Sequence, residues 1–134
     1  MYRLALAALA TTLLAGAKPT VTPLAKAETR AAASGKAKVQ LLAMGANAFI
    51  GRLELAPGAK VPEHRDATEE YIHVLEGKGV ISVDGVKHEI GPGATVYMPA
   101  NALVSYQNGD AKMVALQVFA GPAPAAKYDK WKAP

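Results

Sequence analysis

Three side chains that can bind a metal ion or move a proton lie close together in the sequence: His64, Asp66 and Glu70. His64 and Asp66 are two positions apart, so they point to the same face of an extended segment, and Glu70 enters the next predicted strand, where it can converge on them. One imidazole and two carboxylates form a hard ligand set that favours Fe(II), Mn(II) or Zn(II) over copper. We therefore expect either one such divalent metal or no cofactor.

Two alternatives to a metal site stay open for these side chains. They could bind or protonate a small organic molecule without metal, because a pair of His64 with Glu70 or Asp66 suits general acid–base catalysis. They could also form a solvated polar rim that does no chemistry. If the Glu70 carboxylate is buried, it needs compensation by a metal, by a cationic His64 or by its own protonation.

Other polar side chains on the predicted strands are candidates for the same cavity. Tyr106 shares strand parity with Val104 and either donates a hydrogen bond or proton to a ligand or packs in the core. Gln117 is a polar break in an apolar run and is a candidate ligand-binding residue. His73 is predicted to face away from the candidate carboxylate, and His88 to point inward as a core residue or a ligand. The candidate catalytic residues are His64, Glu70 and Tyr106, and the candidate ligand-binding residues are His64, Asp66, Glu70, Tyr106 and Gln117.

The elements that must position these residues are short strands. From residue 39 onward, runs of β-forming residues are separated by Gly and Pro about every eight to twelve residues, which is typical of a sandwich or barrel. Asp84-Gly85 predicts a two-residue hairpin turn, because both central positions of a type I′ turn need positive φ. Gly91-Pro92-Gly93 predicts a second turn. The predicted strands are residues 39–43, 48–55, 71–75, 79–83, 86–90, 95–98, 103–107 and 113–119.

The first 17 residues have the pattern of an export signal. Arg3 gives a positive start, residues 4–15 are apolar, and Ala15-Gly16-Ala17 fits the small-residue preference of a cleavage site. The apolar run is shorter than the roughly 20 residues that a transmembrane helix needs. We therefore expect a periplasmic or secreted protein that does not stay in the membrane after the signal is cleaved.

The rest of the chain divides into a lead-in, one barrel and a tail. Residues 18–38 lack sustained periodicity and predict a linker, with a helical turn over 29–33. The barrel is predicted over residues 39–121. Residues 122–134 form a tail whose aromatic side chains, Tyr128 and Trp131, are expected to pack onto the barrel or onto a second subunit.

Composition limits the classes of function. The chain has 134 residues, 51% of them hydrophobic, which fits one packed domain. It has no cysteine, so a disulfide framework and thiol chemistry are excluded. The net charge is +4, and the lysines are scattered without a basic stripe, so we expect no nucleic-acid partner. The expected partner is a small molecule.

Two spaced motifs carry a family resemblance. The chain resembles the first cupin motif, G(x5)HxH(x3)E(x6)G, at Gly58, His64, Asp66, Glu70 and Gly77, which are separated by five, one, three and six residues. In this first motif only the second histidine differs, because Asp66 stands in its position.

The second motif follows at the separation found in cupins. The chain resembles this motif, G(x5)PxG(x2)H(x3)N, at Gly93, Pro99, Asn101, Val104 and Asn108, which are separated by five, one, two and three residues. Asn101 replaces the inner glycine and Val104 the histidine. The chain thus resembles a small single-domain cupin over residues 48–119. The resemblance implies an all-β fold, a double-stranded β-helix or jelly-roll barrel with the motif strands at the mouth of the cavity.

The resemblance also implies a function for the cavity. Complete cupins bind a divalent metal with three histidines and one glutamate; here His64 and Glu70 match ligands, Asp66 occupies a ligand position and Val104 cannot bind metal. The metal motifs are therefore degenerate. We expect an exported protein that binds a small ligand, a divalent metal or both in the barrel mouth. The alternative is an enzyme of the dioxygenase, isomerase or lyase type, with or without metal, that acts on a small oxygenated substrate.

A homodimer is a further expectation from the resemblance. Small single-barrel cupins commonly pair by exchanging or adding an edge strand, and a single small barrel has sheet edges to cover. Residues 39–43 are the segment that we expect to be exchanged.

Overall fold

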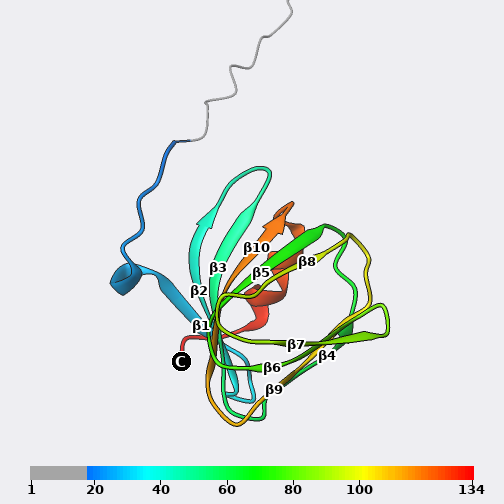
Figure 1. Cartoon of the computed structure of the whole chain (residues 1–134). Helices are drawn as coiled ribbons and strands as arrows, with labels where there is room; N and C mark the ends of the chain where they lie inside the picture. The colour runs from blue at the N-terminus through cyan, green and yellow to red at the C-terminus, as the bar shows by residue number, and fades with distance from the viewer. Residues whose placement is uncertain (1–17) are drawn as a thin grey trace, which may run out of the picture.

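Two antiparallel sheets face each other and enclose the core in the computed structural model, which describes residues 18–134 (Figure 1). The strand orders are β1-β2-β3-β10-β5-β8 and β4-β9-β6-β7. The predicted signal peptide, residues 1–17, lies outside the described residues. This arrangement confirms the predicted all-β jelly-roll barrel. The strands are β1 (Glu28–Ala31), β2 (Ala37–Met44), β3 (Phe49–Leu55), β4 (Lys60–His64), β5 (Glu69–Glu76), β6 (Gly79–Val83), β7 (Val86–Ile90), β8 (Thr95–Met98), β9 (Val104–Asn108) and β10 (Met113–Ala120).

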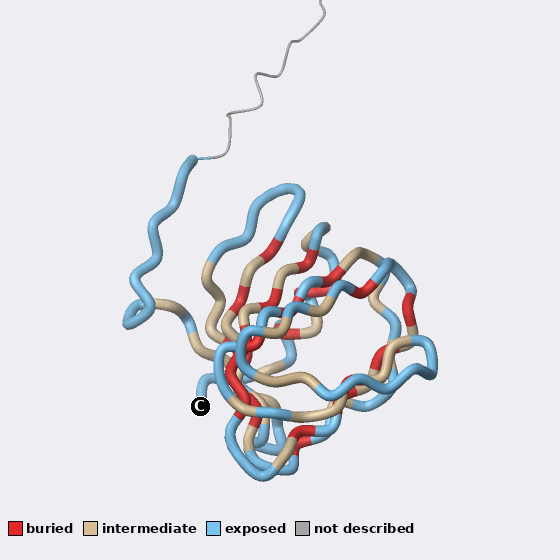
Figure 2. The backbone as a smooth tube through the Cα atoms, in the orientation of Figure 1, coloured by how far each residue is buried: buried red, intermediate tan, exposed pale blue. Residues whose placement is uncertain are grey.

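The core lies against the inner face of the six-stranded sheet (Figure 2). Alternate residues of β3 are buried, as the period of two along a strand requires. Phe49 of β3 and Phe119 of β10 are both buried, and their stacked rings have centroids 5.8 Å apart. The four-stranded sheet contributes fewer buried side chains, and β7 is largely exposed. The six-stranded sheet therefore supplies most of the packed core, and a cavity lies between the two sheets.

The tight turns form where the sequence predicts them. Asp84 has φ 49° and Gly85 has φ 82°, and the hairpin that they close pairs Val83 with Val86. Asn101, which replaces the inner glycine of the second cupin motif, has φ 64°. Because Asn tolerates the left-handed region better than most residues, the substitution keeps the motif's turn.

The sequence pattern missed two strands. β1 forms within the predicted lead-in, where a helical turn was expected over 29–33, because pairing with β2 satisfies its backbone and overrides the helical preference of its residues. β4 contains Pro62, and a proline disfavours a strand because it has no N–H to donate to the neighbouring strand. The structure tolerates this proline because β4 lies at the edge of its sheet, pairs only with β9 and has an irregular register between Val61 and His64.

The segment expected to be exchanged between subunits is not an edge. Residues 39–43 belong to β2, which pairs with β1 on one side and with β3 on the other. Residues 38–41 of β2 are thus paired on both sides within the chain. In the described part of the chain, the ends of this sheet are β1 and β8.

The C-terminal segment packs back onto the barrel. Residues Ala123–Lys130 form a 3-10 helix, η2, which lies beside β10 (Figure 1). A second, shorter 3-10 helix, η1 (Leu24–Lys26), precedes β1. Tyr128 packs on Phe49 with ring centroids 6.0 Å apart, and Trp131 meets Tyr128 edge-on at 4.9 Å. Arg30 of β1 donates a hydrogen bond to the Tyr128 carbonyl. Within residues 18–134, neither helix has the length or apolar character needed to cross a membrane.

The asparagine of the second cupin motif ties two loops together. The Asn108 side chain is buried, and its amide group donates to the carbonyl oxygens of Leu55, Ala56 and Ala111 at 3.3, 2.9 and 3.0 Å. Its Oδ1 accepts a hydrogen bond from the Tyr106 hydroxyl at 3.2 Å. The role of this residue is structural, because its hydrogen-bonding groups are satisfied inside the protein.

Replacing Asn108 with Ala should therefore destabilise the barrel. Buried carbonyl oxygens and a hydroxyl lose their partner, so we expect the free energy of unfolding to fall by about 2 to 3 kcal/mol in urea titrations. Ser105→Ala, on the same strand and only half-buried, is the control and should change stability by less than about 0.5 kcal/mol. Equal stability of the two variants would contradict the assigned role.

Candidate functional site

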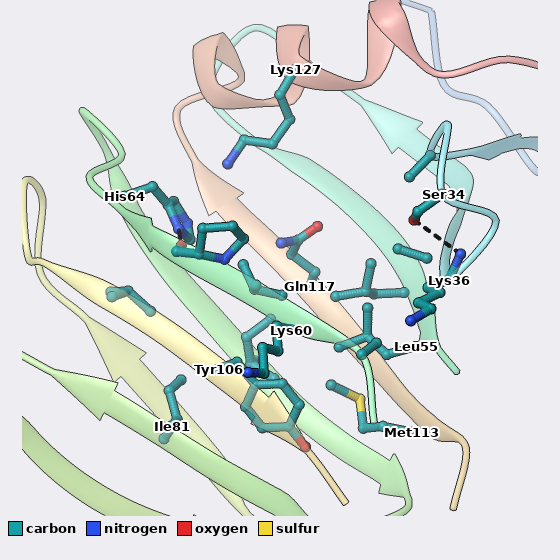
Figure 3. A pocket seen from close by; sticks show the side chains of 18 of the residues that line it. Ser34, Lys36, Leu55, Lys60, His64, Ile81, Tyr106, Met113, Gln117 and Lys127 are labelled. Carbon is teal, nitrogen blue, oxygen red and sulfur yellow. Dashed lines mark hydrogen bonds between the residues drawn. The ribbon is translucent and has the colours of Figure 1, made fainter. Parts of the chain in front are cut away.

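A cavity of about 530 Å³ opens between the two sheets, beneath η2 (Figure 3). Its size lies within the range of pockets that hold small organic ligands. Most of its wall is apolar, and four of its polar residues, His64, Glu70, Gln117 and Lys127, come from β4, β5, β10 and η2. The aliphatic wall includes Leu53, Leu55, Ile72, Ile81, Val104 and Met113, and the polar lining includes Lys36, Lys60, His64, Glu70, Gln117 and Lys127.

A chain of buried hydrogen bonds fixes the carboxyl group of Glu70. Gln117 Nε2 donates to Glu70 Oε2 at 3.1 Å, and Gln117 Oε1 accepts a hydrogen bond from the Tyr128 hydroxyl. Glu70 and Gln117 are only 7% and 6% exposed. The Gln117 amide thus has a hydrogen-bond partner on each side, and this chain joins β5, β10 and η2 at this end of the cavity.

Burial is the main cause that raises the pKa of Glu70 to about 7, and the nearby charge of Asp66 is a second cause in the same direction. Lys127, the Gln117 hydrogen bond and His64 act in the opposite direction but do not offset the burial. Near neutral pH this carboxyl group therefore exchanges between its neutral and ionised forms. A group of that kind can both release and accept a proton.

His64, at the end of β4, is held between two acceptors. Its Nδ1 donates to the Pro62 carbonyl at 2.8 Å, while Nε2 lies 3.4 Å from Asp66 Oδ2. The hydrogen bond with Asp66 raises the pKa of His64, and the Pro62 carbonyl adds to this effect. Since both ring nitrogens face oxygen atoms that accept, the doubly protonated imidazolium is favoured.

Asp66 forms an ion pair with Lys127 of η2. The Lys127 ammonium lies 2.8 and 3.1 Å from the two carboxylate oxygens of Asp66. Burial of Asp66 acts to raise its pKa, but the hydrogen bonds from His64 and Lys127 outweigh burial and lower the pKa. The Lys127 ammonium also lies 5.1 Å from the centre of the Phe119 ring, so the side chain is anchored on two sides.

The donor set does not fit the metal of the complete cupin motif. Within residues 18–134, no group of three or more His, Asp or Glu side chains is placed to hold a metal ion. Of the three predicted ligands, His64 and Asp66 meet at 3.4 Å, but Asp66 also pairs with Lys127 and Glu70 is hydrogen-bonded to Gln117, so the three do not form one donor set. Val104 occupies the remaining ligand position and is buried in the wall.

The remaining predicted residues fall inside and outside the cavity. Tyr106 and Gln117 line it, but the Tyr106 hydroxyl is already donated to Asn108, away from Glu70. His73 is exposed and hydrogen-bonded to Thr95 Oγ1 at 2.8 Å, so it faces away from the cavity. His88 is exposed as well, which corrects its predicted inward position: it lies on β7, an edge strand with little packed against it.

Lys127 is a residue of the cavity that was not predicted from the sequence; η2 places it above His64 and Gln117 (Figure 3). The aromatic residues Tyr128 and Trp131 indicated that the tail packs on something. No local pattern distinguishes Lys127 from the other lysines, because its position depends on how the tail folds across the barrel.

Comparison with known proteins agrees with this architecture. The cupin domain family matches residues 51–119, which is more than half of the chain. The protein therefore belongs to the cupin family.

Similar proteins include lyases of one substrate. A segment of 53 residues is 40% identical to dimethylsulfoniopropionate lyase DddW of Ruegeria pomeroyi, covering 40% of this chain and 35% of that protein. DMSP lyase DddQ of the same organism superposes with a TM-score of 0.54 at 22% identity, over 57% of this chain and 40% of that one. An RmlC-like cupin of Shewanella frigidimarina has a TM-score of 0.71 at 17% identity, over 78% and 92%. The chain thus spans about a third of the curated lyase that it matches.

The raised pKa of Glu70 predicts a pH dependence of stability. The unfolded chain loses this proton near pH 4.5, whereas the folded protein keeps it to about pH 7. Between these two pH values the folded state binds more protons than the unfolded chain, so the free energy of unfolding falls as pH rises. The total fall is up to about 3 kcal/mol, and above about pH 7 there is no further loss from this group.

Glu70→Gln, which cannot ionise, should lose less stability than the wild type between about pH 5 and 8 in urea unfolding. Glu63→Gln, at an exposed position of β4, is the matched control and should follow the wild type. Parallel pH profiles for all three proteins would show that Glu70 has an ordinary pKa.

Proposed function

We propose that this protein binds a small organic molecule in its barrel, with the apolar part of the ligand against the aliphatic wall and its polar group near Glu70 and Lys127. The observation that supports this most is a cavity of about 530 Å³ whose mostly apolar lining includes the hydrogen-bonded pair Glu70 and Gln117 and the cation Lys127. Such pockets bind through apolar contact and gain orientation from a few fixed polar groups.

The proposed binding does not depend on a metal held by His64, Asp66 and Glu70. Asp66 already has two cationic partners, His64 and Lys127. A divalent ion bound at Asp66 would lie next to the Lys127 ammonium and would be repelled by it. In this proposal the lysine supplies the positive charge at the cavity mouth.

A variant that fills the cavity tests ligand binding. Val61 lines the cavity from the edge strand β4 and is only half-buried, so Val61→Trp should occupy the space without disrupting the core. We expect compounds that raise the melting temperature of the wild type to bind this variant at least about tenfold more weakly by calorimetry, because the indole takes their place. Val86→Trp, at the exposed hairpin, should bind like the wild type. Equal binding by both variants would place the ligand elsewhere.

Lyase chemistry is a second candidate function, favoured by the buried Glu70 and by the similarity to a dimethylsulfoniopropionate lyase. In an elimination, the ionised Glu70 takes a proton from the carbon next to a carboxylate. The electron pair of that bond forms the carbon–carbon double bond, and the leaving group departs with the electrons of its own bond. A pKa near 7 suits this proton transfer.

Release of dimethyl sulfide from dimethylsulfoniopropionate tests this second candidate. We expect wild-type activity that a chelator leaves unchanged and that Glu70→Gln lowers by about a hundredfold or more, since the base is lost. Glu63→Gln should keep the activity. Activity that disappears with the chelator, or that survives in Glu70→Gln, would contradict the proposed mechanism.

Export and pairing stay predictions from the sequence. We propose that the mature protein begins after residue 17, lies in the periplasm or outside the cell, and forms a homodimer. The described sheets offer edges for such pairing at β8, β4 and β7, and at β1 outside the bridge between Ala31 and Lys132.

A further inference from the structure

The side chains that line the cavity carry an excess of positive charge. Among the described lining residues, three are lysines, Lys36, Lys60 and Lys127, while Glu70 is the single carboxylic acid. Asp66, outside the lining, pairs with Lys127, but even when it is counted the three lysines outnumber the two carboxylic acids. A ligand that enters the cavity therefore meets more cationic than anionic groups, which favours a ligand with negative charge.

Lys127 is the cation best placed to hold such a ligand. Figure 3 shows its side chain extending from η2 toward the cavity, above His64 and Gln117. Asp66 and the face of the Phe119 ring hold it in place. Little side-chain entropy is then lost when a ligand binds, because the ammonium is already fixed.

The ammonium keeps hydrogen-bonding capacity for a ligand. It has three N–H donors, and its two contacts with protein oxygen atoms are both to Asp66. At least one donor is thus free, and the Lys127 side chain is 34% exposed. By contrast, both nitrogens of His64 face protein acceptors, and the Gln117 amide is used by Glu70 and Tyr128.

We propose that the ligand is an organic carboxylate, with its carboxylate bound to Lys127 at the cavity mouth and its hydrocarbon part against the aliphatic wall. This inference rests on the proposed ligand-binding function and adds the chemical class of the ligand. The aliphatic wall disfavours a highly hydrated inorganic anion, because most of the cavity offers no hydrogen bond to it.

Matched probes that share one body and differ in charge test the proposal. Two sets of probes are titrated into the full chain by calorimetry, near neutral pH and at low salt. One set is phenylbutyrate, phenylbutanamide and phenylbutylamine, and the other is hexanoate, hexanamide and hexylamine. We expect the acid of each set to bind at least about tenfold more tightly than its amide, and the amine to bind most weakly. Added salt should reduce this preference.

Variants assign the preference to Lys127. Lys127→Met should remove it while leaving amide binding within about twofold, and Lys127→Arg, which keeps the charge, should restore most of it. Lys130→Met is the matched control, because Lys130 is an exposed lysine of the same helix and does not line the cavity, and it should behave like the wild type. Circular dichroism checks that each variant is folded.

The outcomes separate this inference from the function on which it rests. Amides that bind as tightly as acids, or a preference that persists in Lys127→Met, would overturn the carboxylate assignment and leave the binding function standing. If none of the acids, amides or amines binds, the proposed function fails, and the assignment of the ligand fails with it.

Discussion

The polar end of this cupin depends on the ion pair between Lys127 and Asp66. It joins η2 to the loop between β4 and β5, two segments that are 61 positions apart in the sequence. Asp66 is 14% exposed and Lys127 34% exposed, so the pair is partly shielded from solvent. A shielded carboxylate is costly without a partner, and here two cationic groups compensate it. The same contact fixes a positive charge at the cavity mouth.

The rest of the polar network follows from burying Glu70. A carboxyl group in an apolar wall either pairs with a cation or becomes easier to protonate, and here Gln117 is its direct partner while the cations face Asp66. Within residues 18–134, no buried side-chain nitrogen or oxygen lacks a hydrogen-bond partner. The buried polar atoms of the site therefore have hydrogen-bond partners within the protein, and Glu70 still has a pKa near neutral pH. The site thus combines a carboxyl group of raised pKa with a fixed cation.

The motif substitutions separate the fold from the metal chemistry of the cupin family. Asn101 keeps the left-handed turn in place of glycine, and Asn108 keeps the hydrogen bonds that tie the loops, so the barrel closes normally. Asp66 and Val104 change the ligand positions without affecting either feature. In this chain Asp66 binds the lysine of the C-terminal helix, and the valine extends the aliphatic wall.

The sequence alone determined the barrel, its turns and the position of most strands, because alternating hydrophobicity and positive φ at Asp84 and Gly85 are local properties. It also indicated His64 and Glu70 as polar residues of the cavity, since the motif spacing assigns their positions, and Gln117, since it interrupts an apolar run. The strands β1 and β4 and the partner of Asp66 could not be predicted from the sequence. These depend on pairing between distant segments: β1 is stabilised by β2, Pro62 is tolerated at a sheet edge, and Lys127 reaches the cavity only once η2 packs on the barrel. Only the tertiary structure decided that a lysine supplies the charge beside Asp66, because an ion pair between distant residues leaves no local pattern.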